Sequence, residues 1–496
     1  MSKIIDIVKI SQGNYIKGKK REDLKNKSQF FTPYEIALQM ISTIDLEKIS
    51  KLKSISILEP SAGCGMLVAA LVDKIINNSN NLQEIFIDVY EKDKELAKIL
   101  KQNLECIKKI VYEKNKVTIN YKVICNNFIL YNSDKWNKNN PGKYDYIISN
   151  PPYKKINKTS EEAVVMNKII YGQPNIYTLF IVMCIKLLKK DGILVVLSPR
   201  SYLTGEYSKK IREYIFENSS LLHIHSFDKR NIFSTVNQEV IICTYSKCQN
   251  IKNVKLSFNG NLEFETRFEQ ILNDKESMSI VVPKSVEDIK ILNKFKQFKY
   301  SLDELGYKVS VGPVVQFRNE EYLSKDIYSA KFAPLLICND IQNNNLIIYD
   351  IRENRKKTHN KSISIKNKYL IKNSNYLLLR KVSARDDNNV ITCAVINKNF
   401  FNHTYVGLDN NLLYFLSNNN SELSIEECYG LYCFVNCNQF SHFYSLINGT
   451  HTINVTDFSK IKFPSKKIII LIGKEIIKSQ IFDKQYCSKI IEKYVF

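Results

Sequence analysis

The chain has 496 residues, which is more than one ordinary domain needs and favours two. Hydrophobic residues make up 44% and charged residues 25%, a balance typical of globular proteins with packed cores. The 72 Lys and Arg outnumber the 50 Asp and Glu, and the formal net charge of +22 favours a polyanionic partner, either nucleic acid or an anionic membrane surface. Part of this excess of positive charge reflects an abundance of Lys. Abundant Lys, Asn and Ile are typical of proteins from AT-rich genomes.

Several classes of protein are disfavoured by apolar runs and cysteine spacing. The N-terminus lacks the long apolar region of a signal peptide, and the most apolar run, residues 176–188, is too short to span a bilayer. The twelve cysteines include no Cys-x-x-Cys pair, which suits free thiols in a reducing cytosol. Cys428, Cys433, Cys437 and His442 fit a buried helix face better than a zinc site. We therefore expect a cytoplasmic bacterial protein without a membrane segment or a metal.

In chain order, residues 54–247 alternate between short apolar strands and amphipathic helical stretches. The predicted strands are residues 54–58, 85–91, 121–125, 144–150, 192–198, 221–227 and 239–245. Helical stretches such as 66–76 and 94–104 lie between them. This alternation predicts a doubly wound α/β domain, whose mostly parallel sheet is covered by helices on both faces.

The pattern changes after about residue 255. Helix-length apolar periods thin out, and short aromatic or Asn-rich segments continue to the C-terminus. We predict two domains, residues 1–255 and 256–496, of which the second is a separate mixed α+β domain.

A glycine turn follows the first strand, in the segment Leu58–Gly65. Ligands of open α/β sheets bind at strand ends beside the topological switch point, and Gly63 and Gly65 allow a sharp turn and a close backbone approach. Any tight strand-to-helix turn could use such glycines. The dinucleotide motif is not matched, because Val68 stands where the third glycine belongs. Glu59 inside the turn suits a cationic cofactor and opposes a pyrophosphate, which points to S-adenosylmethionine.

A second acidic residue, Glu91, ends the second strand. A carboxylate at this place in such a fold commonly accepts hydrogen bonds from both ribose hydroxyls of a nucleoside cofactor. The alternative is a surface acid that caps the next helix.

The fourth strand ends in Asn150-Pro151-Pro152-Tyr153. Two prolines fix the backbone and remove two donors, so carbonyl groups are left to face a ligand. The Asn150 amide oxygen and the Pro151 carbonyl could accept both hydrogens of an exocyclic amine and direct its lone pair at a methyl group. Tyr153 would offer a flat face to a base flipped out of the helix. The alternative is a rigid turn with a half-buried tyrosine.

With these motifs in their order, residues 30–247 resemble the TaqI-like (γ group) N6-adenine DNA methyltransferases of restriction–modification systems. The resemblance implies a Rossmann-like class I S-adenosylmethionine-dependent methyltransferase fold and Asn150-Pro151-Pro152-Tyr153 as the catalytic motif. It implies that Thr32, in Phe31-Thr32-Pro33, contacts the methionine end of the cofactor, which Glu59 also meets. It further implies that Phe233 stacks on the flipped base opposite Tyr153.

One position departs from the family pattern. After the third strand the family usually has an Asp that accepts from the cofactor's adenine amino group, whereas this chain has Asn127 followed by Phe128. An amide oxygen accepts the same bond more weakly because it is uncharged, so we expect Asn127→Asp to leave cofactor affinity equal or tighter. The predicted cofactor-binding residues are Thr32, Glu59, Pro60, Ala62, Gly63, Gly65, Glu91, Lys92, Asn127, Phe128 and Asn150.

The second half contains segments similar to the target-recognition domains of this family, among them 311–318, 376–380 and 448–464. They supply Arg318 and Arg380 as predicted phosphate or guanine contacts, besides Lys381 and Arg385. The predicted substrate-binding residues are Tyr153, Phe233, Arg318 and Arg380.

The sequence thus predicts a site-specific adenine DNA methyltransferase that acts on double-stranded DNA as a monomer. A separate cognate restriction endonuclease stays open as a partner. The alternatives are an N-methyltransferase acting on rRNA or on protein glutamine, since both also present a planar amine or amide, and a catalytically degenerate DNA-binding subunit. A fused nuclease is disfavoured because only about 30 residues precede the first motif, fewer than a domain needs.

Overall fold

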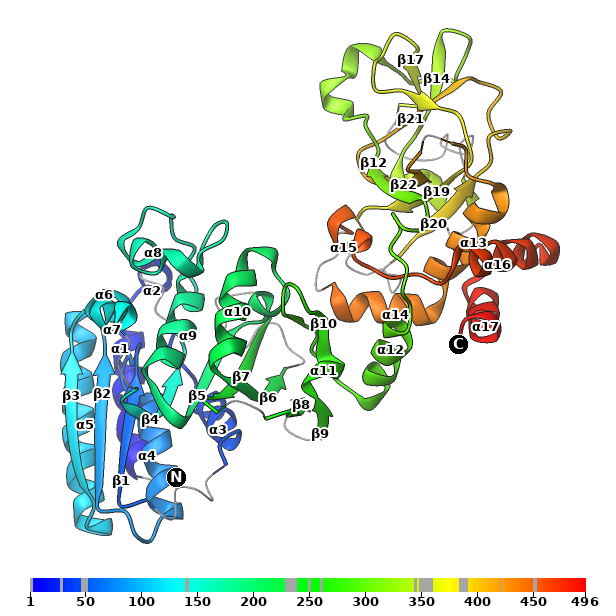
Figure 1. Ribbon diagram of the computed structural model, residues 1–496. Coiled ribbons are helices and arrows are strands. Elements are labelled where there is room, and N and C mark those ends of the chain that lie inside the picture. The colour runs from blue at the N-terminus through cyan, green and yellow to red at the C-terminus, as the bar shows by residue number, and fades with distance from the viewer. Residues whose placement is uncertain are drawn as a thin grey trace. The chain divides into compact units, whose positions relative to one another are not determined.

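The computed structural model describes residues 3–26, 30–45, 52–138, 142–227, 239–248, 251–258, 262–342, 346–347, 360–382, 391–419, 421–448 and 453–496 (Figure 1). The chain forms two compact units, Met1–Val286 and Glu287–Phe496. Each unit is described by itself below.

The first unit is built on a nine-stranded sheet with the strand order β3-β2-β1-β4-β5-β7-β6-β8-β9. Its strands are β1 (Ser54–Glu59), β2 (Glu84–Tyr90), β3 (Thr118–Ile124), β4 (Tyr144–Ser149), β5 (Leu188–Pro199), β6 (Ser220–Ser226), β7 (Val240–Ser246), β8 (Asn253–Phe258) and β9 (Leu262–Arg267). The five strands from β3 to β5 are parallel, whereas β7 runs antiparallel between β5 and β6. All seven strands predicted from the sequence are present, and the expected doubly wound α/β fold is confirmed.

The order of these strands creates a topological switch point. From β1 the chain continues to β2 and β3 on one side, and then returns to place β4 on the other side of β1. The connections after β1 and β4 therefore leave the sheet in opposite directions, which opens a crevice beyond the carboxyl ends of these strands. Glu59 and Asn150 stand at these ends.

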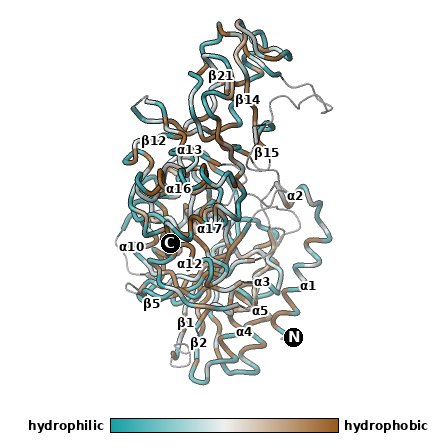
Figure 2. Tube along the Cα trace, turned by 90° about the vertical axis from the view of Figure 1, so that its right-hand side faces the viewer, coloured by the Kyte–Doolittle hydropathy of each residue, from teal (hydrophilic) through white to brown (hydrophobic). Residues whose placement is uncertain are grey.

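Helices cover both faces of the sheet (Figure 1). On one face, a single apolar core joins the sheet to α1 (Lys3–Lys17), α3 (Tyr34–Ser42), α4 (Met66–Asn78) and α5 (Lys94–Asn115). The other face carries α9 (Ile176–Leu187) and α10 (Lys209–Asn218). Brown and teal stretches alternate along α1 (Figure 2), as expected of a helix with one buried and one solvated side.

Helix α9 corresponds to the most apolar run of the sequence. Eleven of its twelve residues are buried, so its apolar character is explained by packing inside the first unit. Among the helices that the structure describes, none has the length and apolar character that crossing a bilayer requires.

The division between the units falls later than the sequence indicated. Residues 256–267 belong to the first unit, because β8 pairs with β6 and β9 pairs with β8 in the same sheet. The predicted boundary at 255 therefore lies inside β8, and the structure divides the chain at residue 286. The sheet continues across the change in sequence pattern that predicts a domain boundary.

The second unit contains two main sheets. A four-stranded sheet has the order β12-β22-β19-β20, and a five-stranded sheet has the order β13-β17-β14-β21-β18. Their strands are β12 (Tyr307–Val311), β13 (Leu323–Ser324), β14 (Phe332–Leu336), β17 (Ser362–Ser364), β18 (Ile371–Lys372), β19 (Tyr376–Arg380), β20 (Cys393–Ile396), β21 (Tyr405–Leu408) and β22 (Leu412–Ser417). A two-stranded sheet pairs β15 (Ile341–Gln342) with β16 (Leu346–Ile347).

The C-terminal part of this unit is helical, whereas the sequence pattern predicts only the helix face of Cys428, Cys433, Cys437 and His442. Helices α13 (Ile425–Asn436) and α14 (Asn438–Ile447) are followed by α15 (Val455–Ser459), α16 (Lys466–Ser479) and α17 (Lys484–Tyr494). Nine of the twelve residues of α13 are buried, and a helix buried on most sides shows no apolar period. Helix α12 (Val286–Lys296) begins at the boundary between the units.

The cysteines of this helical part are buried thiols. Cys428 and Cys433 lie in α13, Cys437 precedes α14, and His442 is paired with Asp288. The described residues contain no group of three or more His, Cys, Asp or Glu side chains that could hold a metal. The shorter helices and strands are α2 (Arg21–Asn26), α6 (Phe128–Tyr131), α7 (Ser133–Asn137), α8 (Glu161–Val165), α11 (Phe268–Ile271), β10 (Leu272–Asp274) and β11 (Ser279–Ile280).

Gly65 has a structural role in starting α4. Its φ is +90°, and a Cβ atom added to it would stand 2.8 Å from a methyl carbon of Leu100. We expect Gly65→Ala to lower the free energy of unfolding by about 1–2 kcal/mol, because an alanine in the left-handed region is strained.

Gly13 is the matched control. It lies inside α1, and a Cβ there meets nothing within 4 Å, so Gly13→Ala should be neutral or stabilising. Denaturant unfolding of both variants checks the expectation. Equal stability of the two variants would contradict it.

Candidate active site

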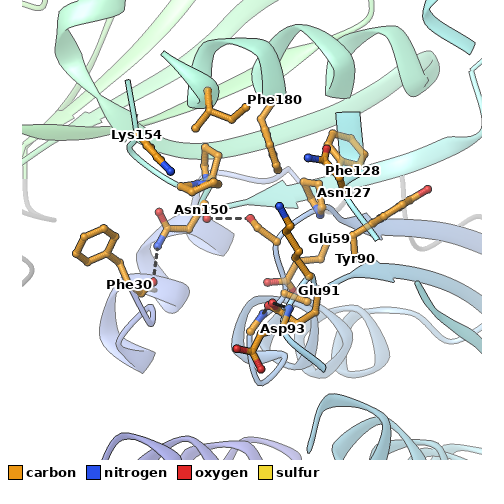
Figure 3. Close-up of a pocket in the computed structure, with 18 of the residues that line it drawn as sticks. Phe30, Glu59, Tyr90, Glu91, Asp93, Asn127, Phe128, Asn150, Lys154 and Phe180 are labelled. Carbon is orange, nitrogen blue, oxygen red and sulfur yellow. Dashed lines mark hydrogen bonds between the residues drawn. The ribbon is translucent and has the colours of Figure 1, made fainter. Parts of the chain in front are cut away.

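One cavity lies at the carboxyl ends of β1, β2 and β4 (Figure 3). Its volume of about 770 Å³ falls within the range of small-molecule and cofactor sites. Twelve of the predicted site residues line it: Thr32, Glu59, Pro60, Ala62, Gly63, Glu91, Lys92, Asn127, Phe128, Asn150, Pro151 and Pro152. The motifs that the sequence placed 120 residues apart therefore meet in one space.

Of the predicted residues that the structure describes in the first unit, Gly65 and Tyr153 do not line the cavity. Gly65 stands behind the turn, at the start of α4. Tyr153 packs beside the cavity, and Phe233 lies outside the described residues together with Asn231 and Ile232. The role of Phe233 therefore stays a prediction.

The glycine turn shapes the floor of the cavity. Gly63 adopts a φ of +54°, and the amide N–H of Ala62 donates to the carbonyl of Tyr90 at 2.9 Å, which ties the turn to β2. Helix α4 then begins at Met66, and its third residue, Val68, donates its amide N–H to Glu59 Oε2 at 2.9 Å. Glu59 thus satisfies an unpaired amide of the first helical turn while it faces the cavity.

Glu59 is a nearly fully buried acid, with only 1% of its surface exposed. Burial raises the pKa of Glu59 well above its usual range, the Val68 amide opposes this effect, and the neighbouring Glu91 carboxylate adds to it. An acid in such a place is best stabilised as a carboxylate by a cation in the same cavity. The ammonium and sulfonium groups of S-adenosylmethionine meet this requirement.

The raised pKa predicts that cofactor affinity depends on pH. A cationic ligand lowers the pKa of Glu59 relative to the free protein, so binding releases a proton at pH values between the bound and free pKa. Affinity should therefore rise with pH up to the free pKa of Glu59 and level off above it.

Calorimetric titration with S-adenosylmethionine in buffers of different ionisation enthalpy measures this proton release. Glu59→Gln should bind more weakly at high pH and should lose the part of the pH dependence that does not come from the ligand's own amino group. The same proton release in both proteins would remove Glu59 from the role.

Glu91 is held by the backbone of two turns. Its Oε2 accepts from the Gly63 amide at 2.9 Å, and its Oε1 accepts from the Asp93 amide at 2.8 Å. Burial raises the pKa of Glu91, and these backbone hydrogen bonds oppose that effect. The alternative of a helix cap is not what the structure shows, because Asp93 caps α5 by accepting from the Glu95 and Leu96 amides. Glu91 instead turns toward the cavity, where its remaining lone pairs suit hydroxyl donors.

Asn150 is fixed in its orientation by the segment before α3. Its Nδ2 donates to Thr32 Oγ1 at 3.0 Å and to the Phe30 carbonyl at 3.3 Å, and Ser61 Oγ donates to its backbone carbonyl at 2.9 Å (Figure 3). Because both amide hydrogens are used, Oδ1 is defined as the acceptor end of the side chain. Thr32 therefore also orients the Asn150 side chain.

Tyr153 is half-buried between two aromatic rings. Its ring stacks at 6.3 Å from that of Phe30 and meets Tyr177 edge-on at 6.0 Å. Its hydroxyl lies 2.9 Å from Asn150 Oδ1 and 3.1 Å from the Leu197 carbonyl. Burial raises the pKa of Tyr153 well above its usual range, so the hydroxyl keeps its proton and acts as a donor. Stacking of this ring on a base stays a prediction.

Asn127 is more fully engaged than the sequence suggested. Its Oδ1 accepts from the Ile129 and Leu130 amides at 3.0 and 3.2 Å and so caps α6, while its Nδ2 donates to Glu162 Oε1 at 2.7 Å. An amide oxygen has two lone pairs, and both are in use. The predicted hydrogen bond from a cofactor amine to Asn127 Oδ1 therefore competes with the helix cap.

Several lining residues were not predicted from the sequence. Phe30, Glu162 and Phe180 belong to no short motif, and they reach the cavity only through the tertiary fold. The one local signal was the position of Phe30 beside Phe31-Thr32-Pro33.

In the second unit, the two predicted arginines lie in different settings. Arg318 is exposed and its guanidinium stands 5.3 Å from the centre of the Phe317 ring, which is itself 71% exposed. Arg380 ends β19 and donates to the carbonyls of Cys338 and Ile341, so part of its donor capacity holds the fold. Arg385 lies outside the described residues.

Comparison with known proteins supports the class of the first unit. Residues 37–233 match the model of the Eco57I restriction-modification methylase family, a span that contains both the glycine turn and Asn150-Pro151-Pro152-Tyr153. The Type II methyltransferase M.BsuBI of Bacillus subtilis is 28% identical over 480 residues, which cover 92% of each chain. The Type II methyltransferase M.PstI of Providencia stuartii is 28% identical over 83% of this chain and 82% of its own.

Solved structures that align with this chain are more distant in sequence. The type IIG restriction endonuclease BpuSI aligns with 94% of this chain and 66% of its own, at 12% identity and a TM-score of 0.46. A nuclease-deletion mutant of the Type ISP restriction–modification enzyme LlaGI, in complex with a DNA substrate mimic, aligns with 90% of this chain and 54% of its own, at 13% identity and a TM-score of 0.47.

The fold, the paired acids and the family match together define a methyltransferase of the restriction–modification type that uses S-adenosylmethionine. Such enzymes methylate DNA. The resemblance that the motifs predicted is thereby confirmed at the level of this class.

Proposed function

We propose that this protein is a site-specific DNA methyltransferase that transfers a methyl group to the N6 amine of adenine. The observation that carries the proposal is the fixed orientation of Asn150, whose Oδ1 is presented as an acceptor at the wall of the cavity that contains Glu59 and Glu91. An acceptor held in this way suits an exocyclic amine, which offers two hydrogens.

Two acceptors of the motif act on that amine. Asn150 Oδ1 and the Pro151 carbonyl take its two hydrogens, which draws the nitrogen toward a tetrahedral form and concentrates its lone pair. No described residue donates to the Pro151 carbonyl, so it is available for this bond. Glu59 and Glu91 would hold S-adenosylmethionine, which would supply the methyl group: a C–N bond replaces the C–S bond, S-adenosylhomocysteine leaves, and the methylated amine gives one proton to water. No Cys lies in the motif, which suits a direct transfer without a covalent enzyme intermediate.

The Tyr153 hydroxyl allows Asn150 Oδ1 to exchange one hydrogen-bond donor for another. Its single proton has two acceptors in reach, Asn150 Oδ1 and the Leu197 carbonyl. When an amine occupies the site, the Tyr153 hydroxyl can donate to the Leu197 carbonyl instead. This leaves a lone pair of Asn150 Oδ1 for the amine. The hydroxyl thus satisfies the amide oxygen before the substrate arrives without blocking it afterwards.

An adenine inside a duplex cannot reach this cavity, so the base must leave the helix. Flipping costs a few kcal/mol, which stacking on aromatic side chains and contacts to the backbone must return. Tyr153 and Phe233 are the proposed stacking residues. The second unit, in which Arg318 is exposed, is proposed to read the recognition sequence of double-stranded DNA.

The class of acceptor is tested by transfer of radioactive methyl groups from S-adenosylmethionine to three substrates in parallel: mixed-sequence duplex DNA, rRNA and total protein. The proposal expects label in DNA only. Label in rRNA or protein, or no label despite cofactor binding, would favour one of the alternative functions and overturn this one.

If the second unit recognises the DNA sequence, its removal should abolish sequence preference without affecting cofactor binding. A chain that ends at residue 285 should bind S-adenosylhomocysteine as the full chain does, yet lose its preference for the methylated sequence. Binding of the full chain should also weaken steeply with salt, because its net charge of +22 releases counterions from phosphates. Fluorescence anisotropy with specific and unrelated duplexes at two salt concentrations measures both effects. Equal sequence preference in the two proteins would contradict the assignment.

A further inference from the structure

Asn127 carries a neutral amide at the position where the family pattern has a charged acceptor. Its oxygen is committed to the amides of Ile129 and Leu130, and its nitrogen donates to Glu162 at 2.7 Å. This arrangement leaves the amide no free lone pair for a ligand. It does, however, fix the position of a carboxylate.

That carboxylate belongs to Glu162, in the short helix α8, and is half-buried. Glu162 lines the cavity together with Asn127, although 35 residues separate them in the chain. A carboxylate has about four lone-pair sites, and Asn127 takes one of them on Oε1. Its second oxygen, Oε2, makes no hydrogen bond to any residue that the structure describes.

The neighbouring walls of the cavity suit a flat ring. Phe128 and Phe180 lie next to Asn127 at one end of the cavity, with their ring centres 5.0 Å apart (Figure 3). Glu91 lies nearby, at the end of β2, where a ribose is expected. A nucleoside whose ribose meets Glu91 would place its base against these rings and beside Glu162.

We propose that Glu162, oriented by Asn127, accepts the hydrogen bond from the 6-amino group of the cofactor's adenine. The charge that the chain lacks at position 127 is thus supplied from α8, and Asn127 acts as a positioning residue. This inference rests on S-adenosylmethionine as the cofactor of the proposed function. It adds a specificity-determining residue that no sequence motif indicates.

The same geometry reverses an expectation from the sequence. Asn127→Asp would set one carboxylate against another at the distance of a hydrogen bond, since the Glu162 oxygen lies only 2.7 Å from the present amide nitrogen. Cofactor affinity should therefore fall in this variant, where the sequence alone predicted equal or tighter binding.

The test compares two ligands whose bases differ at position 6 and, as a consequence, at N1, which is an acceptor in adenine and carries a hydrogen in hypoxanthine. S-adenosylhomocysteine carries an amine at position 6, and S-inosylhomocysteine carries an oxygen that only accepts. The unchanged protein should prefer the adenine ligand by at least about 100-fold, since a site built to accept a hydrogen bond rejects a ligand that cannot donate it. Both affinities are measured by calorimetry without DNA, so the result does not depend on which acceptor is methylated.

One variant should reverse this preference, and a second variant should restore it. In Glu162→Gln, the Asn127 nitrogen requires the Gln oxygen, so the Gln nitrogen turns to the base and the inosine ligand becomes the preferred one. In Asn127→Asp/Glu162→Gln, the Asp accepts from the Gln nitrogen, the Gln oxygen turns to the base, and the adenine preference returns. Glu161→Gln, which changes an exposed neighbour outside the cavity, is the matched control and should resemble the unchanged protein.

A purely structural role would give a different result. Equal loss of affinity for both ligands in Glu162→Gln, or an unchanged preference, would overturn the proposal. Thermal unfolding of each variant shows whether it is folded. If Glu162→Gln is unfolded, the ligand preference of the double variant tests the proposal. Failure of the unchanged protein to bind S-adenosylhomocysteine would instead contradict the cofactor of the proposed function.

Discussion

Replacing Asn150 by alanine should reduce methyl transfer by about 100- to 10,000-fold, the range found when a hydrogen-bonding group that acts in the transition state is removed. The effect arises because Oδ1 is lost as an acceptor for the amine, while Glu59 and Glu91 are left intact. Cofactor affinity should change little, since the side chain makes its hydrogen bonds to Phe30, Thr32 and Tyr153 and none to the acids of the cavity. Single-turnover methylation and titration with S-adenosylhomocysteine measure the two quantities separately.

Two further variants make this result specific. Asn115→Ala removes an exposed amide at the end of α5 and should leave activity unchanged. Asn150→Asp keeps an acceptor but loses the donor that orients it, so its activity should lie between those of the unchanged protein and Asn150→Ala. If Asn150→Ala retained most of its activity, the motif would not be the catalytic site.

Replacing Glu91 by alanine should weaken cofactor binding by about 1.5–3 kcal/mol, the usual contribution of hydrogen bonds to a charged group. The amides of Gly63 and Asp93 also lose their acceptor in this variant, so part of the loss reflects a disturbed turn. A ligand that lacks one ribose hydroxyl separates the two effects. The loss should be smaller for the 2′-deoxy analogue of S-adenosylhomocysteine than for the parent ligand.

The control for Glu91 is Glu113→Ala, an exposed acid on α5 that should leave both affinities unchanged. An equal loss for the two ligands in Glu91→Ala would mean that Glu91 only supports the turn and does not contact the ribose.

The sheet of the first unit was predictable because each strand is a short apolar run and each connection carries a helical period. The meeting of Glu59, Glu91 and Asn150 in one cavity was predictable for a related reason, since parallel strands end at the same edge of the sheet. Helix α13 of the second unit was harder to predict, because a helix that is buried on most sides has no apolar period. The boundary was placed too early, because β8 and β9 extend a sheet whose pattern had already changed.

Within the cavity, the side-chain partners of the predicted residues do not follow from any local sequence pattern. Asn127 was recognised as a departure, yet its partner Glu162 comes from a helix 35 residues away and follows no motif. The contact between Asn150 and the Phe30 carbonyl likewise spans 120 residues and uses a backbone atom, which any residue type could supply. Such contacts depend on tertiary structure, and no local pattern encodes them.

Analysis of the product nucleosides identifies the methylated atom. Duplex DNA is incubated with the protein and S-adenosylmethionine, digested to nucleosides, and separated by liquid chromatography with mass detection against authentic standards. We expect N6-methyldeoxyadenosine as the new nucleoside, in an amount that saturates once every copy of one recognition sequence is modified. Methylated cytosine in its place, or no methylated nucleoside from a protein that binds the cofactor, would contradict it.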